Sequence, residues 1–245
     1  MGWLRVVLRL FLLILWLLAC VAAYYIVQPF TRHNPVSPRF LGGAARIIGV
    51  RRQVSGHPLR RDALLLANHL SWLDILNLAP VTGTAFVAKS ELAKVPLVGW
   101  LCSLNETVFV ERGARLAVGG QVDAVRAALA TGRPVTLFPE GTTGNGGELL
   151  PFKTAMLDVL DPPPAGVRVQ PVVLDYGAAT ANIAWVGEES GLDNALRILA
   201  RAGTIALRMN FLEPFVPAEA SGRKAIGAEV RRRMETAAMP FRHAR

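Results

Sequence analysis

Leu64-Leu65-Leu66-Ala67-Asn68-His69-Leu70-Ser71-Trp72-Leu73-Asp74 is the stretch that decides the fold. Its apolar beginning, within residues 63–67, predicts a buried strand, because short continuous apolar runs are typical of strands in a core. The run stops at Asn68-His69, and Ser71 then has the character of a helix N-cap. The sequence therefore places His69 at the end of a buried strand.

His69 and Asp74 are five residues apart, and this spacing has two interpretations. On a continuous helix the two side chains would diverge by about 140°. If His69 instead precedes the first turn, Asp74 can reach the imidazole, fix its tautomer and leave the other nitrogen free to take a proton. Alternatively, Ser71 and Asp74 form a capping box that only stabilises the helix start. The local pattern leaves both open.

An apolar segment near the N-terminus predicts a membrane anchor. Residues 10–27 are 18 consecutive apolar residues, enough to span a bilayer or to lie deep in it. A secretory signal is the alternative, with a faint lipoprotein-like cleavage box ending at Cys20. The run continues for seven residues beyond Cys20 and contains Tyr24 and Tyr25, which suit a membrane interface. We therefore expect a retained anchor in residues 1–30 and one domain in residues 31–245.

The charge balance indicates an anionic partner. Lys and Arg number 27 against 18 Asp and Glu, for a net charge of +9. Nucleic acid is not favoured, because no stripe of interleaved aromatic and basic residues occurs. An anionic membrane surface explains the charge and agrees with the anchor. The two cysteines, Cys20 and Cys102, form neither a disulfide framework nor a metal-binding spacing.

Further strands and helices alternate along the chain. Apolar or β-branched runs predict strands at residues 85–88, 107–110, 133–138, 167–174, 182–186 and 204–211. Pro171 suggests an edge or irregular position for the fourth of these. Helices are expected from residue 71 and at residues 40–50, 116–129, 149–160, 192–202 and 223–237. The pattern predicts an α/β fold, with a mixed, mostly parallel sheet flanked by helices and an N-terminal membrane helix.

Several predicted strands end in charged residues, as strands at an α/β site often do. Lys89 and Arg112 follow two of them, and either could hold an anion or simply be solvated or salt-bridged. Glu140 ends a third strand, where it could also cap a turn. The following residues 141–147 contain four glycines, which permit close approach of a ligand to the backbone, but lack the lysine of a nucleotide-binding phosphate loop.

Four motifs together resemble those of the glycerolipid acyltransferases of the lysophosphatidate acyltransferase type. They are Asn68-His69-x-x-x-x-Asp74, Val108-Phe109-Val110-Glu111-Arg112, Phe138-Pro139-Glu140-Gly141-Thr142 and Val169-Gln170-Pro171-Val172. The resemblance implies transfer of a fatty acyl group from a thioester to a lipid hydroxyl, with His69 as general base and Asp74 orienting it. It implies direct attack, without an acyl-enzyme, a metal or a cofactor.

The resemblance also implies which residues contact the acceptor. Gly141 and the neighbouring backbone at Thr142 and Thr143, with Glu140 and Arg112, would shape its site. Lys89 and Lys153 fall where similar proteins carry basic residues.

Thr143 departs from the family pattern, which has an arginine there to hold the phosphate of the acceptor. With Leu149-Leu150-Pro151-Phe152-Lys153, this resembles the bacterial branch that acylates lyso-ornithine lipid, whose headgroup carries a carboxylate that Arg112 could meet. A lysophosphatidate acyltransferase that uses another cation is the alternative. A catalytically idle, membrane-anchored lipid-binding protein is a third hypothesis.

The implied partners are acyl carrier protein or acyl-CoA as donor, a lysolipid acceptor and anionic membrane lipid. The expected location is the bacterial inner membrane, with the catalytic domain on the cytoplasmic face, a side that the flanking arginines weakly favour.

Overall fold

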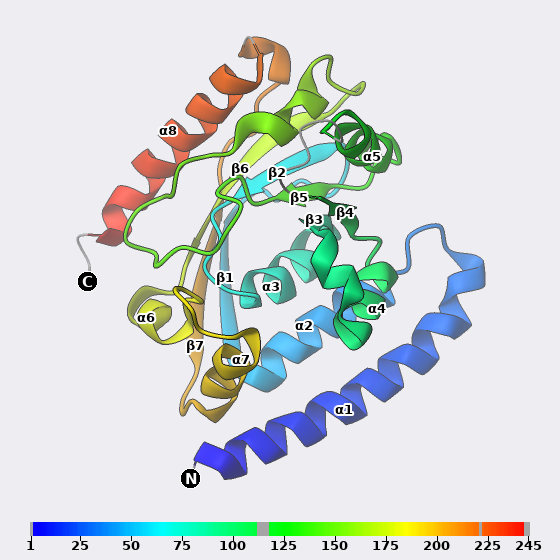
Figure 1. Cartoon of the computed structure of the whole chain (residues 1–245), viewed down its shortest axis with the longest axis vertical. Coiled ribbons are helices and arrows are strands. Elements are labelled where there is room, and N and C mark those ends of the chain that lie inside the picture. The colour runs from blue at the N-terminus through cyan, green and yellow to red at the C-terminus, as the bar shows by residue number, and fades with distance from the viewer. Residues whose placement is uncertain (1, 112–117, 221, 243–245) are drawn as a thin grey trace.

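One twisted sheet forms the centre of the molecule (Figure 1). The computed structural model describes residues 2–111, 118–220 and 222–242. In these ranges, seven strands lie in the order β1-β7-β6-β2-β5-β3-β4. All neighbours are parallel except β6 and β7. The expected mixed, mostly parallel sheet is confirmed. The strands are β1 (Val50–Gly56), β2 (Ala63–Ala67), β3 (Ala85–Lys89), β4 (Val108–Val110), β5 (Val135–Leu137), β6 (Arg168–Asp175) and β7 (Ile205–Phe211).

Helices cover both faces of the sheet, as Figure 1 shows. One apolar core joins the sheet to α2, α3, α6 and α7, and the other joins it to α5, α8 and a 3-10 helix at Thr154–Leu160. Since both faces are covered, β2 is buried at all five of its residues. The α-helices are α1 (Gly2–Val27), α2 (Val36–Ile48), α3 (Leu73–Thr82), α4 (Pro96–Leu104), α5 (Val118–Ala130), α6 (Thr180–Ile183), α7 (Gly191–Ala200) and α8 (Gly222–Arg242). Short 3-10 helices also occur at Gln28–Phe30, Ser90–Lys94, Gly177–Ala179 and Pro217–Glu219.

The helix α1 is long and apolar enough to cross a membrane, and one of its faces packs on the domain. The indole Nε1 of Trp16 donates to the carbonyl of Phe40 in α2 at 3.0 Å, over Gly43, where any side chain would collide with the indole. The guanidinium of Arg9 donates to the carbonyls of Leu199 and Arg201 at the C-terminal end of α7. These bonds fasten both halves of α1 to the helices α2 and α7, which cover one face of the sheet.

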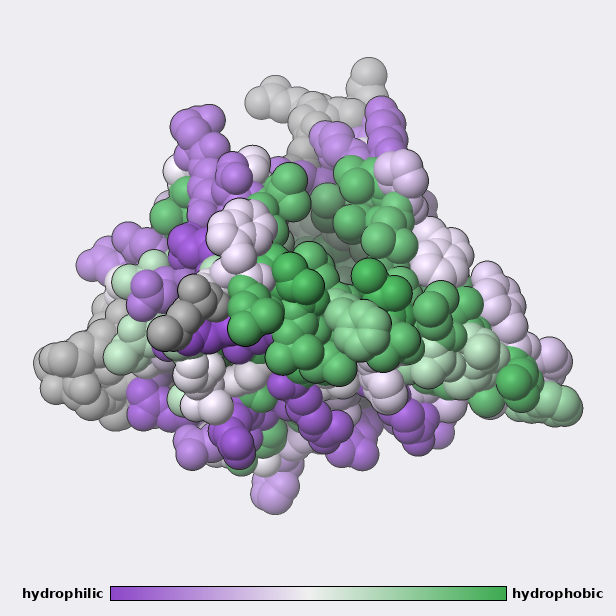
Figure 2. Space-filling model, turned by 90° about the horizontal axis from the view of Figure 1, so that it is seen from below, coloured by the Kyte–Doolittle hydropathy of each residue, from purple (hydrophilic) through white to green (hydrophobic). Residues whose placement is uncertain are grey.

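The outer face of α1 is apolar and exposed. Figure 2 shows apolar side chains gathered on this side of the molecule. The exposed apolar residues include Leu4, Val7, Leu8, Phe11, Ile14, Leu15 and Leu18 on α1, and Val95, Leu97 and Val98 at α4. An apolar surface of this kind suits contact with a membrane.

Three local predictions were wrong. Strand β1 was not predicted, because only Val50 of its seven residues is buried and the sequence therefore shows no apolar run. Residues 182–186 are not a strand. Thr180–Ile183 form one helical turn, and the N–H of Trp185 donates to the carbonyl of Leu70.

The third wrong prediction is the helix at residues 149–160. Only residues 154–160 are helical, as a 3-10 helix. Before them, the N–H of Leu150 donates to Glu140 and that of Lys153 to the carbonyl of Pro139. These bonds to the loop after β5 replace those of a helix.

Pro171 lies inside the sheet and not at an edge, which corrects a further expectation. The carbonyl of Pro171 accepts the N–H of Leu212. The ring nitrogen of Pro171, which has no hydrogen, therefore faces the same neighbouring segment, the one that contains Leu212. The carbonyl of Leu212 instead accepts the side-chain amide of Gln170 at 3.1 Å. Gln170 thus supplies the donor that proline lacks.

Candidate active site

Asn68 fixes the end of β2 against β6. Its Nδ2 donates to the carbonyl of Leu174 at 2.9 Å, and its Oδ1 accepts the N–H of Leu174 at 2.7 Å. The side chain thereby makes the pair of bonds that a neighbouring strand would make. The chain can therefore leave the sheet at His69 with the backbone of β6 still paired.

The structure brings His69 and Asp74 into contact, as their spacing predicts. Nδ1 of His69 lies 2.8 Å from Oδ2 of Asp74, whose side chain is fully buried. The same Oδ2 accepts the N–H groups of Leu70 at 2.7 Å and Ser71 at 2.9 Å. One carboxylate oxygen therefore orients the imidazole and holds the backbone just before α3. The Ser71–Asp74 capping box is only half formed, because the helix N-cap is Trp72 and no side chain caps it.

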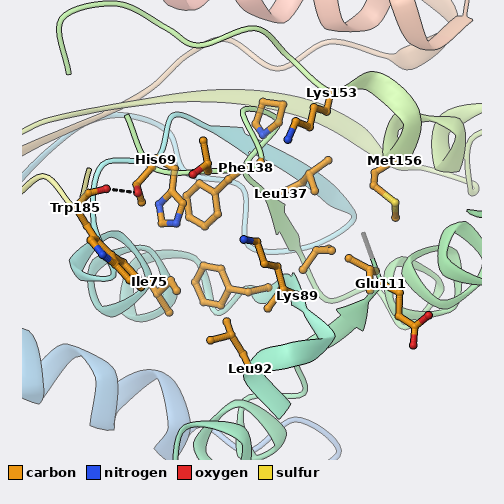
Figure 3. Close-up of a pocket in the computed structure, with 18 of the residues that line it drawn as sticks. His69, Ile75, Lys89, Leu92, Glu111, Leu137, Phe138, Lys153, Met156 and Trp185 are labelled. Atoms are coloured by element: carbon orange, nitrogen blue, oxygen red, sulfur yellow. Dashed lines mark hydrogen bonds between the residues drawn. The ribbon is translucent and has the colours of Figure 1, made fainter. Parts of the chain in front are cut away.

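The other imidazole nitrogen of His69, Nε2, can accept a proton. An N–H at Nδ1 directed to a carboxylate leaves the lone pair on Nε2. The ring stacks on Phe138, with centroids 3.9 Å apart and planes 15° from parallel, as Figure 3 shows. The side chain is 18% exposed and lines the main cavity. His69 is thus held on two sides and open to a substrate on a third.

Glu140 lies behind residues 68–72, the loop between β2 and α3 that contains His69 and is called the histidine loop below. Its Oε1 accepts the N–H of His69 and its Oε2 that of Leu150, each at 3.0 Å. The residue is 3% exposed and is not among those lining the main cavity. Burial raises the pKa of this carboxyl, although the two N–H bonds act in the opposite direction. In this structure Glu140 joins two loops and does not line the cavity.

The turn after Glu140 brings Lys153 to the cavity wall. Gly141 has a φ of +70°, a conformation that favours glycine, and a Cβ there would lie 3.3 Å from Nζ of Lys153. Lys153 therefore lies directly over the glycine backbone. The N–H of Gly144 donates to the carbonyl of His69 at 2.8 Å, which joins the glycine-rich loop to the histidine loop.

Thr143 occupies the place of the family's arginine and has a partner within the protein. Its hydroxyl donates to the carbonyl of Trp185 in a short hydrogen bond. The N–H of Trp185 in turn donates to the carbonyl of Leu70 at 2.9 Å. Thr143 thus fastens the loop at residues 184–189 across the cavity, beside His69.

The main cavity, of about 620 Å³, has mostly apolar walls. Its size is that of a ligand pocket, and its lining suits an aliphatic chain. The ends of β3, β4 and β5 form one side, while the glycine-rich loop, residues 153–156 and residues 185–189 form the other. Lys89 reaches into it from the end of β3, as Figure 3 shows. His69, Gly141, Thr142, Thr143, Lys89 and Lys153 all line this cavity, as does Glu111. Arg112 lies outside the described residues.

Two residues of the site were missed from the sequence. Tyr176 donates its hydroxyl to Oδ1 of Asp74 at 2.7 Å from 102 positions away, and no local pattern signals such a contact. Trp185 forms part of the cavity wall, although its stretch resembles a strand. Both contacts depend on how the chain folds back after β6.

Residues 51–175, which include all four motifs, match the family model described as Acyltransferase. The chain is also 36% identical over 211 residues to the lyso-ornithine lipid O-acyltransferase of Brucella abortus, covering 80% of this chain and 76% of that protein. The chain belongs to the acyltransferase family.

Two further relatives of this acyltransferase come from other bacteria. It is 37% identical over 185 residues to the lyso-ornithine lipid O-acyltransferase of Rhizobium meliloti, with 69% of this chain and 63% of that protein covered. It is 33% identical over 182 residues to the 1-acyl-sn-glycerol-3-phosphate acyltransferase of Neisseria meningitidis, with 72% and 69% covered.

A solved structure shares the fold of this acyltransferase. The crystal structure of the 1-acyl-sn-glycerophosphate acyltransferase PlsC from Thermotoga maritima matches with a TM-score of 0.74 at 21% identity. The match covers 98% of this chain and 95% of that one. It includes the N-terminal helix as well as the sheet.

Proposed function

We propose that this acyltransferase moves a fatty acyl group from a thioester to the hydroxyl of a membrane lysolipid, and that its acceptor is lyso-ornithine lipid. The observation that carries the proposal is the contact between Nδ1 of His69 and Oδ2 of Asp74 at the wall of an apolar cavity. A histidine oriented in this way suits the removal of a proton from a hydroxyl.

In this proposal the reaction is a single displacement. Nε2 of His69 takes the proton of the acceptor hydroxyl while its oxygen attacks the thioester carbonyl. An ester C–O bond forms, the C–S bond breaks, and the proton passes to the departing thiolate sulfur. The buried Asp74 stabilises the positive charge that the imidazole carries between the two proton transfers.

The cations of the cavity are assigned to the acceptor headgroup. Lys89 and Lys153 both line the cavity, and neither has an ion pair with another described residue. The backbone at Gly141, with Thr142, would complete the acceptor site, while Glu140 would support it by holding the histidine loop. Arg112 remains a prediction from the motif, as the partner of the acceptor carboxylate.

Two observations support lyso-ornithine lipid as the acceptor. The Brucella and Rhizobium relatives are named as lyso-ornithine lipid O-acyltransferases. Thr143 stands where the resemblance implies an arginine that holds phosphate, and its hydroxyl is engaged with Trp185. The alternative acceptor is lysophosphatidate, which the Neisseria relative favours. Lys153 over Gly141 could then serve as the phosphate-binding cation.

The donor and the location form part of the same proposal. The donor is an acyl thioester of acyl carrier protein or coenzyme A, and no cofactor is required. The apolar face of α1 binds the bacterial inner membrane, with anionic lipid attracting the basic chain and the catalytic domain on the cytoplasmic face.

An acyl-transfer assay with the purified full chain in detergent tests the proposal. Lyso-ornithine lipid and lysophosphatidate are offered separately, each with acyl carrier protein and coenzyme A thioesters. The wild type is compared with His69→Ala and with His57→Ala, a matched control whose side chain is exposed and outside the cavity lining.

We expect product from lyso-ornithine lipid, retained by His57→Ala and abolished by His69→Ala. Product from lysophosphatidate alone would overturn the acceptor assignment. Activity that survives in His69→Ala would overturn the mechanism, and lipid binding without transfer by any form would favour the idle lipid-binding protein.

A further inference from the structure

Tyr176 is a buried tyrosine that touches the catalytic pair from behind. It follows directly after β6 and is 1% exposed. Its hydroxyl lies 2.7 Å from Oδ1 of Asp74, the carboxylate oxygen that His69 does not use. Tyr176 is not among the residues lining the main cavity, so its contact with the reaction runs through Asp74.

The two carboxylate oxygens of Asp74 accept hydrogen bonds from different donors. Oδ2 accepts from His69 Nδ1 and from two backbone N–H groups, whereas Oδ1 has the tyrosine hydroxyl. Backbone N–H groups can only donate, so this arrangement fits the acceptor-only carboxylate form. Burial and the neighbouring carboxylate raise the pKa of Tyr176 well above its ordinary value, which keeps the hydroxyl protonated as a donor.

The fold fixes the tyrosine independently of the substrate. Asn68 is bonded twice to the backbone of Leu174, two residues before Tyr176. The same asparagine precedes His69. The two hydrogen bonds of Asn68 between β2 and β6 therefore fix the spacing between His69 and Tyr176.

We propose that Tyr176 is a positioning residue of the acyltransferase, whose hydroxyl holds Asp74 in the orientation in which Oδ2 meets His69. This inference rests on the proposed function, in which His69 is the base. Without the hydroxyl, Oδ1 has no other hydrogen-bond partner among the described residues, and the buried carboxylate can turn away from the imidazole.

Tyr176→Phe tests the inference, because it removes the hydroxyl and keeps the ring. We expect kcat to fall about ten- to a hundredfold, the effect of losing one hydrogen bond to a charged group. The KM for the lysolipid and for the thioester should stay unchanged, since Tyr176 does not line the cavity. Thr236→Val is the control. It removes an exposed hydroxyl on α8 that donates to the carbonyl of Arg232, and it should keep full activity.

A double-mutant cycle shows whether the hydroxyl acts through Asp74. The loss of kcat caused by Tyr176→Phe is measured in the wild type and again in the Asp74→Asn background. We expect the second loss to be much smaller than the first. If Tyr176→Phe does not fold, Phe, Leu and Ala at position 176 are compared in the Asp74→Asn background, where the carboxylate that the hydroxyl would hold is absent. Similar residual kcat in all folded variants then supports the inference, and a graded loss with side-chain volume contradicts it.

Three results would overturn the inference: an equal loss in both backgrounds, a raised KM with unchanged kcat, or full activity of Tyr176→Phe. These outcomes are distinct from failure of the proposed function. That failure appears as activity in His69→Ala, whereas an inactive His69→Ala beside a fully active Tyr176→Phe removes only the inference about the tyrosine.

Discussion

The loops that follow β2 and β5 each bury one carboxylate, and they use it differently. Asp74, in the first turn after the β2 loop, accepts four hydrogen bonds, two of them from the side chains of His69 and Tyr176. Glu140, at the end of β5, accepts two, both from backbone N–H groups. Asp74 therefore acts on a side chain that lines the cavity, whereas Glu140 acts on the course of the backbone.

The difference shows that two acidic residues of one site need not share a role. Both are almost fully buried, and both belong to motifs of the acyltransferase family. Only the atoms that they bond distinguish the carboxylate that orients the imidazole of His69 from the one that shapes a loop. The two roles predict different outcomes on substitution.

Asp74→Asn should produce the largest loss. The amide cannot carry the charge that stabilises the imidazolium, so kcat should fall by about 10² to 10⁴. Steady-state kinetics with lyso-ornithine lipid measure the effect. Asp193→Asn, an exposed site at the start of α7, is the control and should keep its activity. A loss below about tenfold would contradict the division of roles.

Glu140→Gln should affect the free energy of unfolding more than it affects kcat, the opposite of Asp74→Asn. Its amide nitrogen cannot accept a backbone N–H, so one of the two loops loses a hydrogen bond. The free energy of unfolding should fall by about 1–3 kcal/mol, while kcat falls by no more than about tenfold. Chemical denaturation and kinetics on the same sample test this, with the exposed Glu213→Gln as control. A kcat loss as large as that of Asp74→Asn would give both carboxylates the same role.

Thr143→Val should have a smaller effect, which sharpens the description of the β5 loop. It removes the hydroxyl that donates to Trp185 and keeps the shape of the side chain. We expect kcat/KM to fall about two- to tenfold with both candidate acceptors, because the loop at residues 184–189 loses one anchor. Thr236→Val, which removes a hydroxyl-to-carbonyl bond on α8, is the control. A loss restricted to one acceptor would show that Thr143 contacts the headgroup.

The pH dependence of stability gives the smallest effect. Burial raises the pKa of Glu140 above its ordinary value of 4.5, so just above that pH the folded chain binds more protons at this group than the unfolded chain. Its contribution to the free energy of unfolding therefore decreases as the pH rises through this window. The stability difference between wild type and Glu140→Gln should be larger at about pH 5 than at about pH 7, by less than about 1 kcal/mol. Denaturation at both pH values measures it, and an opposite trend would contradict the pKa direction.

The fold was predictable where burial leaves a local signal. The apolar run of β2 is buried at every residue and β7 is buried at every second residue, and both were predicted as strands. The mostly exposed edge strand β1 gives no such signal, and neither does Gln170, whose amide replaces the missing donor of Pro171. Those contacts arise only when distant segments meet.

The site divides in the same way. The contact between His69 and Asp74 was one of the two interpretations of their spacing, because a histidine in the loop before the helix comes within reach of an aspartate in its first turn. Tyr176 comes to Asp74 from 102 positions away, and its partner cannot be found from periodicity or composition. The sequence motif marks Glu140 but does not say that its oxygens serve the backbone.

The bonds of Arg9 to the end of α7 have a consequence for the order in which the chain assembles. Their partners lie 189 to 192 residues further along the sequence. During synthesis α1 leaves the ribosome long before α7 exists, so the part of α1 around Arg9 cannot meet α7 until most of this sequence has been translated, whereas Trp16 can meet α2 much earlier. The two halves of α1 therefore reach their final contacts at different times.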